Sequence, residues 1–130
     1  MKEEIHILPT HNSPEVVFSP EGIIKIKGRA LSVNNTEFPE QIMNGFELYL
    51  IDPPDTTDVI IAFEYLNSFS AKTLVSILKK LSQAILQPKT FTIRWYYEED
   101  DQDMLELGKY ISEIRNMPVE FIITDDITLI

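Results

Sequence analysis

The sequence predicts a single α/β domain in which an open mixed sheet is flanked by helices, with the elements in the order ββαβαβαβ. The apolar, β-branched segment 59–63 is short enough to be a buried strand. The residues that follow it place apolar side chains on one face at helical spacing. Strands and helices then continue to alternate, which is typical of parallel strands joined by right-handed crossovers.

Composition and charge exclude several classes of protein. The 130 residues hold no internal repeat or low-complexity linker, so we expect one domain over residues 1–130, and an apolar fraction of 44% suffices for a core. Without cysteine, disulfides and thiolate-bound metals are excluded. No apolar run reaches the roughly eighteen residues of a membrane span, and residues 1–5 do not resemble a signal peptide, so we expect a cytoplasmic protein. A net charge of −10 argues against binding to nucleic acid and favours binding to basic surfaces on partner proteins.

The N-terminal part is predicted to be a hairpin that follows an irregular leader. Pro9 and Pro14 oppose regular pairing in the leader, residues 6–13. The hairpin then comprises a strand at 16–18, a type I turn at 19–22 and an alternating strand at 24–28. It supplies the antiparallel part of the sheet, and residues 28–35 leave it as a polar loop.

Periodicity predicts the remaining elements. Pro39 suits the first turn of a helix. The three helical stripes are Ile42, Phe46, Tyr49 and Leu50; then Leu74, Ile77, Leu78, Leu81 and Ile85; then Met104, Leu107, Gly108, Ile111 and Ile114. Proline-containing stops at 52–55, 87–88 and 116–118 end these helices. Residues 91–97 alternate as a strand, 119–123 form the last strand, and 124–130 are a tail.

Two hydroxyls, those of Ser68 and Ser70, lie where the central strand turns into a helix. This is the carboxyl edge of an α/β sheet, where ligands and partners are usually bound. Unpaired N–H groups and the positive end of the helix dipole would accommodate a phosphate on either serine. Lys72, in the first turn, could pair with that phosphate or only with water. The more ordinary interpretation is that one of the serines is the N-cap.

The acidic run 98–103 offers an alternative function. Its carboxylates could hold a divalent cation in a small metal-binding enzyme. The run lacks the central glycine and the final glutamate of a Ca²⁺ loop, and acids are also favoured at the start of a helix. The simpler interpretation is therefore a helix start on a solvated loop.

No set of residues predicts catalysis. His6 and His11 both fall in the leader, where we expect them to be solvated, and neither is a good base for Ser68. Glycine-rich phosphate loops and a Gly-x-Ser-x-Gly elbow are absent. The aromatic run 95–97 is expected in the core and not as a base-stacking platform. We therefore expect neither enzyme activity nor a cofactor.

The serine at a helix start is similar to the anti-sigma-factor antagonist (STAS) architecture, in which such a serine is phosphorylated to switch partners. Four stretches carry a closer resemblance over nearly the whole chain: Ser13 to Pro20, Ile26 to Leu31, Tyr65 to Lys72 and Arg94 to Met104. In order and spacing they resemble the Thr-Pro-Glu-Ile opening, the Gly-Arg-Ser loop, the Tyr-Leu-Asn-Thr-Ser-Ser-x-Lys run and the Trp-Tyr-Tyr acidic run of the SiaC family of bacterial regulatory phosphoproteins.

The resemblance implies a partner-switching phosphoprotein. A kinase of the histidine-kinase-like fold would phosphorylate the position after Leu-Asn, a PP2C-type phosphatase would remove the phosphate, and the unmodified protein would bind an effector such as a diguanylate cyclase. That position is Ser68 here, and Ser70 is the second choice. The expected partner-binding residues are Arg29, Tyr65, Asn67, Ser68, Phe69, Ser70 and Lys72. The role of the 29–39 loop stays open. A scaffold domain that does not switch partners is a further alternative function.

Overall fold

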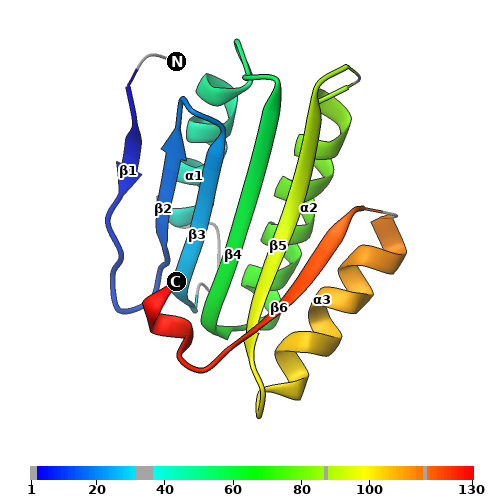
Figure 1. The fold of residues 1–130 in the computed structure, drawn as a ribbon. Helices are drawn as coiled ribbons and strands as arrows, with labels where there is room; N and C mark the ends of the chain where they lie inside the picture. Colours follow the sequence, from blue (N-terminus) through cyan, green and yellow to red (C-terminus); the bar gives the residue numbers. More distant parts are fainter. Residues whose placement is uncertain (1–2, 32–36, 87, 116) are drawn as a thin grey trace.

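The computed structural model describes residues 3–31, 37–86, 88–115 and 117–130, which form one sheet with helices packed against it (Figure 1). The strands are β1 (Ile5–Ile7), β2 (Glu15–Ser19), β3 (Ile23–Ala30), β4 (Thr56–Leu66), β5 (Thr90–Glu98) and β6 (Val119–Thr124). The helices are α1 (Glu37–Tyr49), α2 (Ser68–Ala84), α3 (Gln102–Arg115) and the 3-10 turn η1 (Ile127–Leu129). Within the described ranges, no helix is long and apolar enough to cross a membrane.

The sheet has its strands in sequence order, β1-β2-β3-β4-β5-β6. β1, β2 and β3 pair antiparallel, whereas β3, β4, β5 and β6 pair parallel. Each crossover between parallel strands leads to the next strand on the same side of the sheet. Right-handed connections therefore place α1, α2 and α3 on one face, as Figure 1 shows. The predicted open mixed α/β sheet is confirmed, and the likeness to the STAS architecture stays a prediction.

The predicted irregular leader is wrong over its first residues. Ile5–Ile7 form β1 and pair with β2, with His6 opposite Val17, so the element order begins with three strands. Pro9 lies beyond the end of β1 and removes no donor from it, and an edge strand needs a partner on one side only. The predicted tail is shorter than expected, because β6 continues to Thr124 and η1 follows.

The core lies between the sheet and the helices. Trp95, Ile61 and Ile93 on the strands are at most 1% exposed, and Leu78 and Leu81 on α2 are fully buried, as the alternating and helical patterns predict. These helix-facing side chains remove the largest apolar surfaces from water, which is the main favourable term in folding.

Two buried polar side chains in this core find partners. The Trp95 indole Nε1–H donates to the Met104 carbonyl oxygen at 3.0 Å. The Tyr49 hydroxyl lies 2.6 Å from the Thr57 hydroxyl, and burial raises the pKa of Tyr49. Because both groups are hydrogen-bonded, their burial does not carry the cost of an unsatisfied polar atom.

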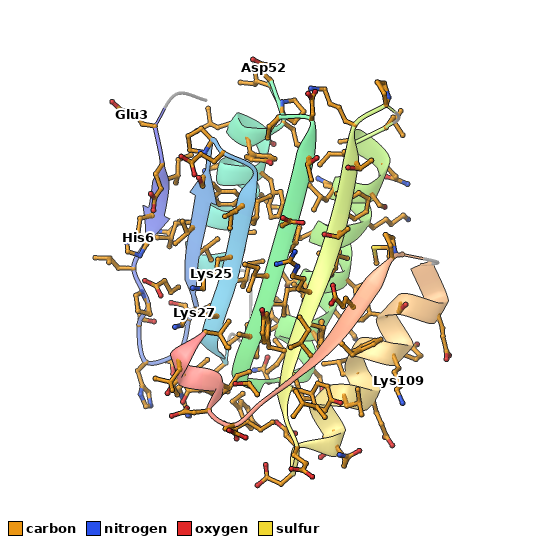
Figure 2. All side chains as sticks on the ribbon, viewed as in Figure 1. Glu3, His6, Lys25, Lys27, Asp52 and Lys109 are labelled. Carbon is orange, nitrogen blue, oxygen red and sulfur yellow. The ribbon has the colours of Figure 1, made fainter. Side chains whose placement is uncertain are left out.

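The opposite face of the sheet carries no α-helix in the described part of the chain, and the C-terminal segment crosses it (Figures 1 and 2). Lys27 on β3 donates through Nζ to the carbonyl oxygens of Thr128 at 3.2 Å and Ile130 at 2.9 Å. The Ile127 N–H donates to Glu98 Oε2 at 2.9 Å. These contacts join residues up to 103 positions apart and hold η1 against the sheet.

The close approach of α3 to the sheet generates a stability prediction. A Cβ at Gly108 would lie 2.8 Å from Trp95 and Phe121, whose rings are packed in place. Gly108→Ala should lower the free energy of unfolding by about 1–3 kcal/mol through overpacking. Alanine is favoured over glycine in a helix by about 1 kcal/mol, which opposes this loss. The exposed neighbour provides the control: Lys109→Ala should change stability by less than about 0.5 kcal/mol. Urea unfolding measures both, and equal stability of the two variants would contradict this packing.

Candidate functional site

The candidate site is the sheet edge where β3 and β4 end and α2 begins. The pairing of β3 and β4 shifts register between Gly28 and Arg29, and beyond this bulge Arg29 lies opposite Tyr65 and Ala30 opposite Leu66. The Asn67 N–H then donates to the Ala30 carbonyl oxygen at 3.1 Å, directly after the last residue of β4. The start of α2 is therefore tied to the end of β3.

Asn67 is the N-cap of α2, so the interpretation of a serine as the cap is wrong. Its backbone is extended (φ −82°, ψ 172°), and its side-chain oxygen accepts a hydrogen bond from the Ser70 N–H at 2.9 Å. Asparagine caps helices as well as serine does, and it is the residue at which the strand geometry ends. Consequently neither serine hydroxyl is used to close the helix.

The two serines have opposite environments. Ser68 is the first residue of α2 and is exposed. Ser70 is 2% exposed, and its Oγ is buried with no hydrogen-bond partner among the described residues. A modifying enzyme could therefore reach the Ser68 hydroxyl in the folded protein, but would need the helix start to open before it reached Ser70.

Most of the other predicted partner-binding residues lie at this edge. Tyr65 is 52% exposed, Phe69 is half-buried, and Arg29 is exposed at the end of β3. Lys72 is exposed on α2, four residues after Ser68, and residues at this spacing are neighbours on a helix surface. Of the 29–39 loop, residues 32–36 lie outside the described residues, so its role stays a prediction.

A small polar cavity of about 260 Å³ opens beside this edge. It is lined by Arg29, Phe63, Glu64, Glu98, Asp101, Ile127 and Thr128. Sequence reasoning missed it because η1 forms one wall, and no local pattern shows that the C-terminal residues return to the sheet.

The carboxylates of the 98–103 run have separate structural tasks. Asp101 accepts a hydrogen bond from the Met104 N–H at 3.2 Å, as a capping residue at the start of α3 does, while Glu98 binds the backbone of Ile127. Among the described residues, no three acidic or histidine side chains gather as metal ligands would. The run therefore fits the predicted helix start, and the alternative of a metal-binding enzyme gains no support.

His6 is exposed, as expected, but it also has a hydrogen-bond partner. His6 Nε2 lies 2.6 Å from Glu15 Oε2, a contact between β1 and β2. β2 and β3 separate β1 from β4, so His6 is not placed to act as a base for Ser68. His11 is exposed, as expected.

Because Ser68 is exposed and Ser70 is buried, a carboxylate introduced at each position should have opposite effects on stability. Ser68→Asp should raise the free energy of unfolding by about 0.3–1 kcal/mol, because an exposed acid is favourable at a helix start. Ser70→Asp should lower it by about 3 kcal/mol or more, because the charge would be buried without a partner. Ser70→Ala, which removes only an unpartnered hydroxyl, is the control and should be close to neutral. Urea unfolding measures all three, and a tolerated Ser70→Asp would refute the burial of Ser70.

Comparison with known proteins bears on the fold and the family. The model of the family described as "SiaC family regulatory phosphoprotein" matches residues 7–124. An uncharacterized protein of Pseudomonas aeruginosa (strain UCBPP-PA14), PA14_02130, is 24% identical over 88% of this chain and 92% of its own length. The fold is also that of SiaC in its complex with the diguanylate cyclase SiaD from Pseudomonas aeruginosa (TM-score 0.81, 23% identity, 92% of this chain and 99% of that one). Apo-SiaC from Pseudomonas aeruginosa gives a TM-score of 0.78 at 24% identity, with 92% and 98% covered. The chain therefore belongs to the SiaC family of regulatory phosphoproteins.

Proposed function

We propose that this protein is a non-enzymatic, cytoplasmic signalling phosphoprotein in which reversible phosphorylation of Ser68 switches binding to partner proteins. The observation that carries the proposal is the contrast between the two serines. Ser68 is exposed at the first residue of a helix that Asn67 already caps, whereas Ser70 is 2% exposed. The Ser68 hydroxyl is thus reachable, and within the described residues the cap of α2 does not use it.

The family supports the kind of partner. SiaC of Pseudomonas aeruginosa is the activator of the diguanylate cyclase SiaD and forms a complex with it. We accordingly infer an effector of that class for this chain, together with a kinase of the histidine-kinase-like fold and a PP2C-type phosphatase. Serine keeps the hydroxyl that the kinase would modify. Half-buried Phe69 stands where the family motif has a small residue, so the surface beside Ser68 differs there from the family pattern.

The mechanism rests on charge at the helix start. A phosphate adds about −1.5 to −2 charges, which the free N–H groups of the first turn and the nearby Lys72 can stabilise inside the domain. A partner surface that fits a neutral hydroxyl would instead meet a desolvated charge or a like charge. Binding would then be lost without refolding of the domain.

Variants of Ser68 test this switch. Ser68→Ala should bind the effector constitutively, and protein phosphorylated at Ser68 should bind at least about tenfold more weakly, since like-charge contacts at interfaces cost several kcal/mol. Ser68→Asp should weaken binding in the same direction. Titration calorimetry with a diguanylate cyclase from the source organism, together with its cyclase activity, measures these effects.

Ser82 provides the matched control at the other end of α2, about 20 Å along the helix from Ser68 at 1.5 Å per residue. Ser82→Ala and Ser82→Asp should leave effector binding unchanged. Equal affinity of the phosphorylated and unmodified proteins would favour a scaffold domain that does not switch.

A further inference from the structure

The charge of α2 is opposite to that of the chain. Its 17 residues include Lys72, Lys79 and Lys80 and no acidic residue. The whole chain, by contrast, carries 21 acidic and 11 basic residues, for a net charge of −10. A basic helix on an acidic protein attracts acidic partner surfaces and orients them on approach.

A groove lies between this helix and α3, which is its neighbour in Figure 1. The groove has a volume of about 480 Å³ and is lined by Ala71, Lys72, Val75, Ser76, Lys79, Leu107, Tyr110 and Ile111. Val75 and Leu107 are only half-buried and Tyr110 is 59% exposed, so apolar surface stays in contact with water along it. The described lining residues include no acid.

We propose that this groove binds an acidic amphipathic helix of the effector; the proposal rests on the proposed function and specifies the surface that the switch controls. Apolar residues of the partner helix, spaced by three and four positions, would pack on Val75, Leu107 and Tyr110. Lys72 and Lys79 lie two helical turns apart, about 10.5 Å at 1.5 Å per residue, and would each meet a carboxylate.

The charges of α3 set the orientation of that helix. Asp103, Glu106 and Glu113 are exposed on α3 but do not line the groove, whereas the two lining lysines belong to α2. Acids of the partner would be attracted to the α2 side and repelled from the α3 side. A basic helix would lack this match, because its cations would face Lys72 and Lys79.

Lys72 relates the groove to Ser68 through its position on α2. Lys72 follows Ser68 by four residues, the spacing at which helix side chains meet, and Lys72 is one of the lining residues. A phosphate on Ser68 would pair with Lys72 and place negative charge at this end of the groove. One modification would thus remove an attractive contact and add a repulsive one for an acidic helix.

Two matched synthetic peptides test the groove. Both are helices of about five turns (about 18 residues) with the same leucine stripe; one has glutamates beside the stripe, and the other has lysines. Fluorescence anisotropy with the full chain should show the acidic peptide binding at least about tenfold more tightly, which corresponds to two partly exposed charge pairs. The double variant Lys72→Glu with Lys79→Glu should abolish or reverse this preference.

Two further variants locate the binding. Tyr110→Ala should weaken binding of the acidic peptide by about tenfold, because an exposed aromatic anchor is lost. Lys109→Glu makes the charge change of one of these two substitutions at an exposed position of α3 (labelled in Figure 2) that is not among the lining residues, and it should leave the affinity within about twofold. Phosphorylated chain should bind the acidic peptide at least about fivefold more weakly than unmodified chain.

The outcomes separate this proposal from the proposed function. Ser68 control of effector binding without groove-dependent peptide binding would overturn the groove and leave the switch intact. Groove-dependent binding of the acidic peptide to a chain that no kinase modifies would keep the groove and overturn the switch. Equal binding of both peptides would also overturn the groove. So would self-association that light scattering detects in the wild type and Tyr110→Ala abolishes, because the occupant would then be a second copy.

Discussion

The hydrogen bonds of Asn67 determine how the candidate site is arranged. Its N–H donates to Ala30, which ties the start of α2 to the end of β3, and its side chain accepts the Ser70 N–H. A helix that begins at this point turns Ser70 into the core and leaves Ser68 in solvent. The same start brings Lys72 to the surface one turn later. Exposure of one serine, burial of the other and proximity of a cation therefore all depend on where β4 ends.

The two faces of the sheet are covered by different parts of the chain. Every described α-helix packs on one face of the sheet, because the strands follow one another in sequence order and each crossover has the same hand. The other face is partly crossed by η1, which Lys27 and Glu98 hold in place. The surfaces proposed for partner binding lie on the helical side and at the edge beside it, where α2 carries positive charge on an acidic protein.

Periodicity sufficed to predict strands β2 to β6, the three α-helices and the core, because alternating apolar residues such as Ile93 and Trp95 have one low-energy placement against amphipathic helices. Features that depend on distant residues could not be predicted in this way. β1 forms because β2 offers an edge, His6 meets Glu15 across that pair, and Lys27 binds a carbonyl 103 residues away. At the site, the turn and its two serines were visible in the sequence, but the cap was assigned to the wrong residue type. Asparagine and serine cap about equally well, so only the end of β4 distinguishes Asn67.

Phosphosite mapping by mass spectrometry decides whether Ser68 is the residue that switches partner binding. The protein is purified from its own host, with and without PP2C-type phosphatase treatment, and is also coexpressed with the cognate kinase. We expect one phosphate, on Ser68, that the phosphatase removes. A phosphate on Ser70 would contradict the assignment of the exposed serine, and no phosphate after kinase coexpression would contradict the switch itself.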